Sequence, residues 1–306
     1  MNKTLVIGAA GQIGTELVEE LRARRGVDQV IASDIQIKNL LMPCYGLDAT
    51  DPDKVRKIIQ QEGISEVYNL VAMLSAKGEK EPQKAWDLNM KTLFIILDLA
   101  KEGKIKKIFW PSSIAVFGPS SNSVGAPQYG SMEPTTSYGI SKLAGELWCQ
   151  YYFQNYGVDI RSIRYPGLIS WRTKPGGGTT DYAIEIFHSA RRGKEFISFL
   201  GPETRLPMMY MEDAVKAAIQ LMEADSEMIK IRTSYNLAAV DFTPAELFEE
   251  IRKFYPGLKI SYNPDLRQNI ADSWPDSIND SHARQDWGWN HQFDLKMMVK
   301  DMVNNV

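Results

Sequence analysis

Short apolar runs along the chain alternate with segments in which apolar residues recur every three or four positions. The first run, Leu5 to Ile7, is too short for a helix, and the apolar positions that follow it, up to Leu21, have helical spacing. Further strand-like runs lie at 29–34, 67–71, 107–110 and 160–164, and a helical pattern covers 82–102. Regular alternation of this kind predicts an α/β fold built on a doubly wound parallel sheet.

The pattern becomes irregular after about Pro166, where a Pro- and Gly-rich stretch, "TKPGGGTTDY", begins at Thr173. The later stretch "SYNLAAV" (234–240) again has the composition of a strand, and we expect it to return to the sheet. These changes predict one large domain and a smaller, interleaved C-terminal lobe that binds the substrate. The expected bounds are 1–170 with return segments near 207–240 for the large domain, and 171–206 and 241–306 for the lobe.

Composition is that of a globular protein without a nucleic-acid partner. The chain has 306 residues, of which 44% are hydrophobic, and a formal net charge of −3, with no long basic run. Two cysteines, Cys44 and Cys149, exclude a disulfide framework and have no neighbouring metal ligands. No charged-then-apolar leader or membrane-length span is present, so we expect a cytoplasmic protein with no membrane partner, or one whose leader has been removed.

Three glycines separate the first strand from the first helix in the stretch "TLVIGAAGQIGTEL". Gly8, Gly11 and Gly14 are spaced three apart, so the stretch reads as strand, tight turn and helix. Such a turn lets the backbone approach a pair of phosphates, which the free amides and the dipole of the helix N-terminus favour. The pattern indicates a Rossmann-type dinucleotide site, although a plain strand-to-helix turn explains an isolated motif equally well.

A carboxylate follows at the distance that a dinucleotide site requires. The second strand-like run ends in Asp34, about 20 residues beyond the last glycine, where it can accept both hydroxyls of an adenosine ribose. A 2′-phosphate there would meet a like charge, and Ile35 to Ile37 supply no arginine to offset it. The residues therefore favour NAD over NADP; the alternative is a solvated aspartate at a strand end.

The candidate chemistry lies in the stretch "SYGISK". Tyr138 and Lys142 are four residues apart, which on a helix places both side chains on one face. Free tyrosine has a pKa of about 10, so a tyrosine that acts as a base needs a nearby positive charge, and we expect Lys142 and an oxidised nicotinamide to lower that pKa. The spacing alone is weak evidence, because Tyr255 and Lys259 share it with Pro256 between them.

Two serines follow a predicted strand at the edge where open α/β sheets bind ligands. Ser112 and Ser113 come directly after the run at 107–110, so one hydroxyl can hold a substrate oxygen beside the tyrosine. Without the other motifs, two serines at the start of a loop would be the simpler interpretation.

Together these motifs, with Asp48 after the third strand and the stretch from Ser112 to Gly118, resemble the extended short-chain dehydrogenase/reductase family over about the first 170 residues. The resemblance implies that the glycine turn binds pyrophosphate, that Asp34 binds ribose, and that Leu47 and Asp48 lie near the adenine. It further implies cofactor contacts at Gln12, Ile13, Leu70, Ala72, Lys142 and Tyr165.

The same resemblance implies a catalytic set. Tyr138 would be the acid/base, Ser113 the catalytic serine and Ser112 an accessory donor to the substrate. Lys142 would act on Tyr138 and also hold the nicotinamide ribose. Phe117 departs from the pattern, since sugar-nucleotide members of the family commonly have tyrosine there, which removes one polar contact.

Stretches over the remaining chain are similar to the threonine dehydrogenases of the epimerase-like branch of that family. They are "AMLSA" (72–76), "SIRYPGLIS" (162–170), "PGGGTTDYA" (175–183), "LPMMYMEDA" (206–214) and "IADSWP" (270–275). The resemblance implies that NAD oxidises the β-hydroxyl of threonine to 2-amino-3-oxobutanoate, without a metal. It also implies a homodimer that packs through paired helices, one of them covering 141–156. The zinc-dependent route to that product would need a Cys/His ligand set, which two cysteines and three scattered histidines do not offer.

A threonine zwitterion needs donors for its carboxylate. The amides of 176–178, Gly178 among them, can form an anion-binding concavity, with hydroxyls from Thr179 and Thr180 beside it. Ser75 follows the fourth strand on the same sheet edge as Ser113. From the residues alone, a flexible loop and a helix start remain the simpler interpretations, and Trp274 is expected to pack in the core.

Two other classes of function remain open. A nucleotide-sugar epimerase or dehydratase would return the hydride to its substrate and release almost no NADH. A non-catalytic NAD-binding protein would keep the glycine turn and lose the catalytic set, and the presence of Tyr138, Lys142 and Ser113 disfavours it.

Overall fold

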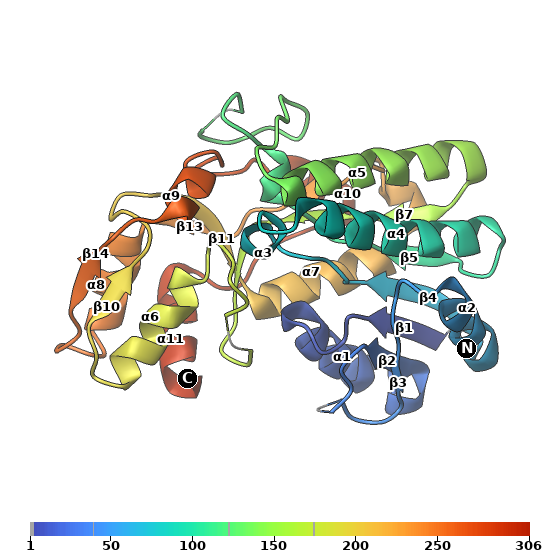
Figure 1. Ribbon diagram of the computed structural model, residues 1–306, viewed down its shortest axis with the longest axis horizontal. Coiled ribbons are helices and arrows are strands. Elements are labelled where there is room, and N and C mark those ends of the chain that lie inside the picture. Colours follow the sequence, from blue (N-terminus) through green and yellow to red (C-terminus); the bar gives the residue numbers. More distant parts are fainter. Residues whose placement is uncertain (1–2, 39, 122, 174) are drawn as a thin grey trace.

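The structure, a computed structural model, describes residues 3–38, 40–121, 123–173 and 175–306. Two lobes lie side by side, with the N-terminal end of the chain in the larger and the C-terminal end in the smaller (Figure 1). Over the described ranges, no helix combines the length and the apolar character needed to cross a membrane.

A sheet of six parallel strands forms the centre of the larger lobe, in the order β3-β2-β1-β4-β5-β7. The strands are β1 (Lys3–Ile7), β2 (Val30–Asp34), β3 (Cys44–Gly46), β4 (Ile64–Asn69), β5 (Lys107–Phe109) and β7 (Asp159–Arg161). The strand order reverses between β1 and β4, and at such a point ligands bind outside the carboxyl ends of the strands. The predicted α/β fold with a Rossmann-type, doubly wound sheet is confirmed.

The single strand predicted at 160–164 is wrong, because the structure divides it between two sheets. β7 ends at Arg161, and after Ser162 the chain continues as β8 (Ile163–Tyr165). The small parallel sheet that contains β8 has the order β12-β8-β6, with β6 at Ser112–Ser113 and β12 at Tyr235–Asn236. The backbone N–H of Tyr235 donates to the oxygen of Ser162 at 2.9 Å, so β12 joins the chain just where β7 ends. The stretch 234–240 therefore joins this small sheet and not the central one.

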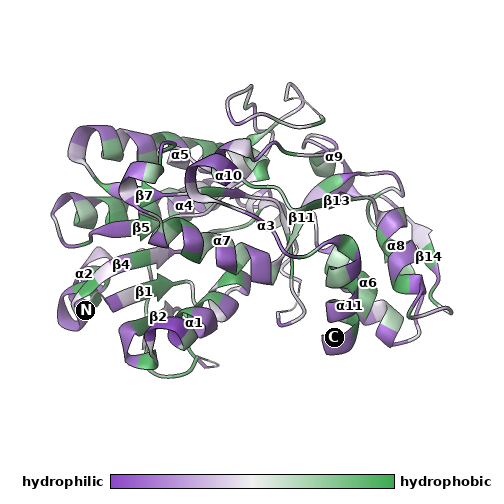
Figure 2. Ribbon diagram, turned by 180° about the vertical axis from the view of Figure 1, so that it is seen from behind, coloured by the Kyte–Doolittle hydropathy of each residue, from purple (hydrophilic) through white to green (hydrophobic). Residues whose placement is uncertain are grey.

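Helices cover both faces of the central sheet (Figure 1). One face carries α1 (Gln12–Arg25), α7 (Met211–Glu223) and α10 (Ser281–Trp287), and the other carries α2 (Pro52–Glu62), α4 (Pro82–Lys101) and α5 (Ser137–Tyr156). Side chains of a strand alternate between its faces, and accordingly Val6 packs in the first core whereas Leu5 and Ile7 pack in the second. The helices carry both hydrophobic and hydrophilic stretches in Figure 2, as elements with one buried face do.

The smaller lobe has its own core. Its strands are β9 (Gly167–Ile169), β10 (Phe196–Ser198), β11 (Leu206–Tyr210), β13 (Val240–Phe242) and β14 (Ile260–Tyr262), and its helices are α6 (Tyr182–Arg191), α8 (Pro244–Arg252), α9 (Leu266–Ala271) and α11 (Leu295–Asn305). The sheets have the orders β13-β11-β9 and β10-β14. β11 serves both lobes, because Met208 packs in the core of the smaller lobe and Met209 in the core of the larger one.

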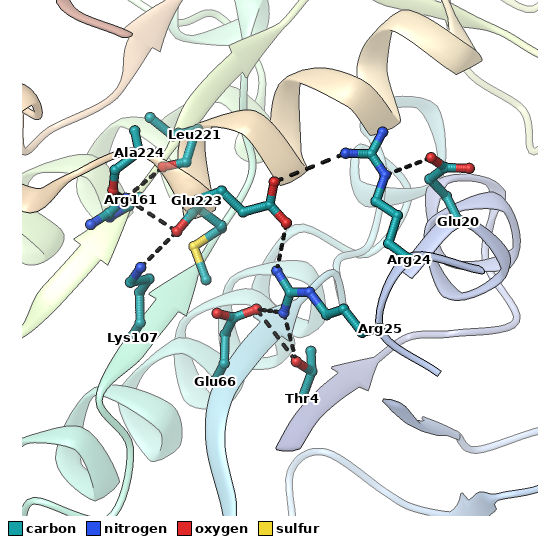
Figure 3. A network of polar contacts seen from close by, with 11 residues as sticks. Thr4, Glu20, Arg24, Arg25, Glu66, Lys107, Arg161, Leu221, Glu223 and Ala224 are labelled. Carbon is teal, nitrogen blue, oxygen red and sulfur yellow. Dashed lines mark hydrogen bonds and ion pairs between the residues drawn. The ribbon is translucent and has the colours of Figure 1, made fainter. Parts of the chain in front are cut away.

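Basic side chains hold the last turn of α7 against the central sheet (Figure 3). Nη1 of Arg161 donates to the carbonyl oxygens of Leu221 and Ala224, each at 2.6 Å, and Nζ of Lys107 donates to that of Met222 at 2.6 Å. Carbonyls at the end of a helix have no partners within the helix, and cations also interact favourably with its dipole there. The network therefore stabilises the position of α7 on the sheet.

A second group of contacts in the same network joins α7 to α1 and β4 (Figure 3). The Arg25 guanidinium lies 2.5 Å from a carboxylate oxygen of Glu66 and 3.2 Å from one of Glu223. Arg25 also donates to the hydroxyl of Thr4 at 3.0 Å. These contacts lie near the amino ends of β1 and β4, at the edge opposite the one at which parallel strands bind ligands.

Candidate active site

A cavity of about 250 Å³ lies at the carboxyl ends of β1 and β4, walled by residues of both lobes. The predicted site residues in its wall are Gly8, Gly11, Gln12, Ile13, Gly14, Leu70, Ala72, Ser75, Ser112, Ser113, Tyr138, Lys142, Tyr165, Gly178, Thr179 and Thr180. The other three predicted site residues, Asp34, Leu47 and Asp48, lie outside this wall. A larger groove of about 940 Å³, between α1 and α7, contains none of the predicted residues.

The glycine turn between β1 and α1 is built without room for side chains. Gly8 has a φ of +86°, and a Cβ on Gly14 would lie 2.2 Å from the carbonyl oxygen of Gly8. Amides of Gly8 and Ala9 both donate to the oxygen of Ser33, at 2.9 and 3.0 Å, which fixes the turn to β2. These positions therefore require glycine.

The residues around that turn fit a dinucleotide. No side chain caps α1 at Gly11, so the amides of its first turn are available to an anion. The buried Nε2 of Gln12 has no hydrogen-bond partner among the described residues. An unpartnered donor beside an uncapped helix N-terminus suits a ligand with phosphate oxygens.

Asp34 lies next to the glycine turn, and its carboxylate supports that turn. Its Oδ2 accepts the backbone N–H of Ala10 at 3.1 Å, and its Oδ1 accepts that of Gln36 at 3.0 Å. Leu47 is buried and its N–H donates to the backbone oxygen of Asp34 at 2.9 Å. Asp34 is only half-buried, so its remaining lone pairs face solvent where a ribose would lie.

The carboxylate of Asp48 is already bound within its own turn. It accepts the backbone N–H of Thr50 at 2.9 Å and the Thr50 hydroxyl at 2.7 Å. These two hydrogen bonds lower the pKa of Asp48. A contact with adenine remains a prediction for Leu47 and Asp48, since neither lies in the cavity wall.

Tyr138 and Lys142 lie in the first turns of α5, as their spacing predicts. The helix begins after Thr136, whose hydroxyl accepts the N–H of Gly139 at 3.0 Å. Lys142 is 2% exposed, and its Nζ donates to the carbonyl oxygen of Pro111 at 2.6 Å. The same Nζ lies 5.5 Å from the centre of the Tyr138 ring. The two side chains therefore share the cavity wall.

The electrostatics differ from the expectation that Lys142 lowers the pKa of Tyr138 below that of free tyrosine. Burial raises the pKa of Tyr138 to about 12, and a hydrogen bond with Ser113 opposes this only in part. Burial likewise lowers the pKa of Lys142 to about 7, against the effects of Cys149 and Glu146. Without a nicotinamide, desolvation therefore dominates the pKa of Tyr138, and the lowering of that pKa by Lys142 together with an oxidised nicotinamide stays a prediction.

The two serines of β6 have different partners. Ser113 hydrogen-bonds with Tyr138, and its Oγ also accepts the N–H of Ala115 at 3.2 Å. Ser112 instead donates its hydroxyl proton to Oε1 of Glu146 at 2.6 Å. This arrangement does not favour the predicted role of Ser112 as a donor to the substrate, because its one proton is held by a buried carboxylate.

The backbone amides of the loop at 176–178 bind a carboxylate of the same chain, that of Asp181. The carboxylate of Asp181 accepts the N–H of Gly177 and that of Gly178, each at 2.7 Å. The prediction that these amides bind a substrate carboxylate is wrong for this arrangement, since Asp181 takes that place. Asp181 lies in the cavity wall, and burial raises its pKa against those hydrogen bonds. Asp181 is not among the site residues predicted from the sequence, although an aspartate three residues after a glycine loop is a typical partner for its amides.

Other hydroxyls of the cavity are available. Thr179 is 1% exposed, and its Oγ1 has no hydrogen-bond partner among the residues that the structure describes. Ser75 begins α3 (Ser75–Gly78) and also lies in the cavity wall. It is therefore both the start of a helix and a residue within reach of a ligand. The Tyr165 hydroxyl, by contrast, donates to the oxygen of Ala214 at 2.7 Å, which leaves only its ring for a ligand.

Two aromatic residues differ in their relation to the cavity. Trp274 is half-buried in the wall, in addition to packing in the core of the smaller lobe. Phe117 is buried outside the wall, 5.6 Å from the guanidinium of Arg164. Its difference from tyrosine therefore removes no group from the cavity. Within the described part of the chain, no group of three or more His, Cys, Asp or Glu residues could hold a metal ion.

Comparisons with known proteins agree with this geometry. A model of the NAD dependent epimerase/dehydratase family matches residues 4–238. A protein of Staphylococcus saprophyticus, described as an uncharacterized epimerase/dehydratase, is 46% identical over 100% of this chain and 97% of its own length.

Two solved structures of L-threonine dehydrogenases align with nearly the whole chain. The holo form of a GalE-like L-threonine dehydrogenase from Cupriavidus necator has a TM-score of 0.97 and 52% identity, over 99% of both chains. The apo form of a monomeric L-threonine 3-dehydrogenase from a metagenome has a TM-score of 0.95 and 44% identity, over 99% of this chain and 98% of that one.

Proposed function

Because the chain belongs to the NAD dependent epimerase/dehydratase family, we propose that it is an NAD-dependent L-threonine 3-dehydrogenase. It oxidises the β-hydroxyl of threonine to 2-amino-3-oxobutanoate. One observation carries the proposal: a hydrogen-bonded Ser113–Tyr138 pair, with Lys142 beside it, shares a small cavity with an uncapped glycine turn. The similarity to L-threonine dehydrogenases over almost the whole chain supports the choice of substrate.

Three residues of the cavity have separate roles in the proposed oxidation. When bound, the dinucleotide supplies a hydride acceptor beside the substrate. Tyr138 takes the proton of the β-hydroxyl, because an alcohol that keeps its proton cannot become a neutral ketone. Ser113 holds the same oxygen in line with Tyr138. Lys142, when protonated, stabilises the phenolate of Tyr138 electrostatically.

The polar groups of the cavity suit an amino acid. The cavity extends from the glycine turn to Gly178, Thr179, Thr180 and Asp181. The free hydroxyl of Thr179 and that of Ser75 are candidates for the amino-acid end of threonine, with Thr180 and Gly178 beside them. Buried polar groups are normally hydrogen-bonded, so the unpartnered Thr179 favours a polar ligand.

The structure also supports a preference for NAD. The half-buried carboxylate of Asp34 lies at the end of β2, and the side chains that follow it, at 35–37, carry no positive charge. A 2′-phosphate would face the like charge of Asp34, and the first basic residue after it along the chain is Lys38. The proposed cofactor is therefore NAD.

A nucleotide-sugar epimerase on the same scaffold is the second candidate, favoured by the description of the staphylococcal relative. The similarity of nearly the whole chain to L-threonine dehydrogenases, at 52% and 44% identity, argues against it.

The test is steady NADH formation by the purified chain with NAD and a panel of amino acids and nucleotide sugars. We expect NADH to accumulate with L-threonine and not with the nucleotide sugars. Interconversion of a nucleotide sugar without net NADH would establish the second candidate. A chain that binds NAD and converts neither class would contradict both.

We also propose a homodimer that packs through α5. Ile140, Leu147, Trp148 and Tyr151 are exposed on this helix, and Trp86 is exposed on the adjoining α4. Residues four and seven apart lie on one face of a helix, so Ile140, Leu147 and Tyr151 form one apolar stripe. Since one similar enzyme is described as monomeric, the assembly has to be measured on this chain.

A further inference from the structure

The ammonium of Lys142 is held by two groups that carry no charge. Its Nζ donates to the carbonyl oxygen of Pro111 at 2.6 Å and lies 4.4 Å from the centre of the Trp110 indole ring. Both partners belong to the segment between β5 and β6, which leads directly into Ser112 and Ser113. Trp110 and Lys142 are almost fully buried, so water does not compete for these contacts.

No carboxylate pairs with Lys142 among the residues described. Glu146 is the acidic residue one turn further along α5, but its carboxylate binds the guanidinium of Arg164 at 2.7 Å. The same carboxylate accepts the hydroxyl of Ser112. The carboxylate nearest to Lys142 on its own helix is thus paired with another residue and acts on Lys142 only through its field.

We propose that Trp110 is a positioning residue that holds the Lys142 ammonium at the cavity wall through the face of its indole ring, without neutralising its charge. This inference rests on the proposed function, in which the field of Lys142 acts on Tyr138. A cation within about 6 Å of an indole centre is attracted by the ring quadrupole, and the attraction is larger when the pair is desolvated. A carboxylate partner would hold the lysine equally well but would cancel its field at Tyr138.

The helix is shaped to admit the indole ring. Gly145 lies one turn beyond Lys142 on α5, and a Cβ there would lie 2.3 Å from Cη2 of Trp110. Real side chains do not approach that closely, so any residue other than glycine would displace the ring. The position of Trp110 beside Lys142 therefore depends on a second residue, Gly145, which lies outside the cavity wall.

Removal of the Trp110 indole should change the pKa of Lys142 in a predictable direction. The titratable or charged groups around Lys142 are Tyr138, Glu146 and Cys149 on α5, and Arg164 and Tyr165 on β8. The Trp110→Leu substitution changes none of them. It removes an attraction that exists only for the protonated amine, so the pKa of Lys142 falls further below its value of about 7.

The test is an NMR titration of the full chain with isotopically labelled lysine side chains, with the Lys142 signal assigned by its loss in Lys142→Met. We expect the titration midpoint of Lys142 to fall by about one pH unit in Trp110→Leu and by less in Trp110→Phe, which keeps an aromatic face. The Gly145→Ala variant keeps the indole but displaces it, and it should lower the midpoint in the same direction. If Trp110→Leu does not fold, the Phe and Gly145→Ala variants decide the question.

Trp289→Leu is the matched control, since Trp289 is as deeply buried but packs in the core on the other face of the sheet. The titration midpoint of Lys142 in Trp289→Leu should equal that in the wild type. A fall in this control as large as in Trp110→Leu would overturn the proposal. An unchanged Lys142 midpoint in the Trp110 variants would overturn it as well. Threonine oxidation is measured on the same samples. If the Lys142 midpoint shifts in the Trp110 variants but the wild-type chain does not oxidise threonine, the role of Trp110 is supported and the proposed function is contradicted. If the wild-type chain oxidises threonine but the midpoint does not shift, the proposed function is supported and the role of Trp110 is contradicted.

Discussion

Ser112 donates its hydroxyl proton to Glu146 at 2.6 Å, and through this contact the serine strand β6 is fastened to α5. Glu146 is fully buried, and its two carboxylate oxygens accept three hydrogen bonds from the guanidinium of Arg164. Arg164 also donates to Asn236 at 2.9 Å and to the backbone of Gln128 at 3.0 Å. The elements that carry Ser113, Tyr138 and Lys142 are therefore connected by one buried ion pair.

Replacement of Glu146 by Ala should destabilise the protein strongly. The substitution leaves the buried charge of Arg164 without a partner, which typically costs about 3–5 kcal/mol of unfolding free energy. Urea unfolding followed by circular dichroism measures this change. The exposed pair Arg252–Glu249 is the control: Glu249→Ala should change the free energy by less than about 1 kcal/mol. Equal effects of the two variants would contradict the structural role of the buried pair.

The Tyr138→Phe variant should lose turnover and keep its cofactor. It removes only the hydroxyl that takes the substrate proton, so kcat for threonine should fall on the order of 10²-fold or more. Affinity for NAD, measured by calorimetry, should change little, because Tyr138 does not touch the glycine turn. A variant with nearly wild-type turnover would eliminate Tyr138 as the base.

The same pair of residues predicts the pH dependence. As a base, Tyr138 works only when its proton is lost, and burial raises its pKa to about 12, so the rate should rise with pH across the neutral and alkaline range. Deprotonation of Lys142, whose pKa is lowered to about 7, removes the positive charge that favours the phenolate and opposes this rise. The rate measured from neutral to alkaline pH checks the sign, and a rate that falls throughout that range would contradict it.

Asp34→Ala should weaken the preference for NAD. The substitution removes two acceptor oxygens for the ribose and also removes the charge that repels a 2′-phosphate. We expect the KM for NAD to rise and the activity with NADP to increase relative to the wild type. The interpretation of Asp34 is wrong if the wild-type enzyme already prefers NADP.

Thr179→Val should impair threonine binding without affecting NAD. The change keeps the shape of the side chain and removes a buried hydroxyl that has no partner among the described residues. Loss of a hydrogen bond to a charged group costs about 1.5 kcal/mol or more, which raises the KM for threonine about tenfold. Thr179→Ser is the control and should stay close to the wild type. Ser75→Ala should behave like the valine variant, and an equal loss of NAD affinity in either would place that residue outside the substrate site.

The proposed homodimer predicts a change of mass in solution. Leu147→Glu together with Tyr151→Glu places charges on the exposed stripe of α5 and should convert a dimer into a monomer, as measured by sedimentation velocity. Ile197→Glu puts a charge on an equally exposed apolar position of the smaller lobe and should leave the dimer intact. A wild-type chain that sediments as a monomer at micromolar concentration contradicts the proposal.

Much of the fold could be predicted because its signals are local. The glycine spacing predicts the turn before α1, and the helical spacing at 82–102 agrees with α4 (Pro82–Lys101) to within one residue. The four-residue spacing of Tyr138 and Lys142 places both on one face of α5. Family membership and the Rossmann-type sheet are likewise confirmed, whereas the domain bounds and the roles of the site residues remain predictions.

Most features that the sequence did not reveal depend on partners far along the chain, and the exception is Asp181, which lies three residues after Gly178. Ser112 resembles Ser113 in sequence, and only the buried Glu146 distinguishes their roles. The amides around Gly178 have the composition of an anion site, and nothing in a hydropathy pattern shows that Asp181 already occupies it. Likewise, the break after Arg161 arises because β12 pairs with the chain from that point.

The interleaved chain has a consequence for synthesis on the ribosome. A nascent chain that ends near Ser170 contains every strand of the central sheet, but it lacks α7, which begins at Met211. Until the segment 171–210 and then α7 have emerged, the apolar residues Val6, Tyr68 and Phe109 have no cover from that helix. Because α10 (Ser281–Trp287) packs in the same core, that core is complete only when nearly the whole chain has emerged, an order that exposes the protein to aggregation and to chaperones during translation.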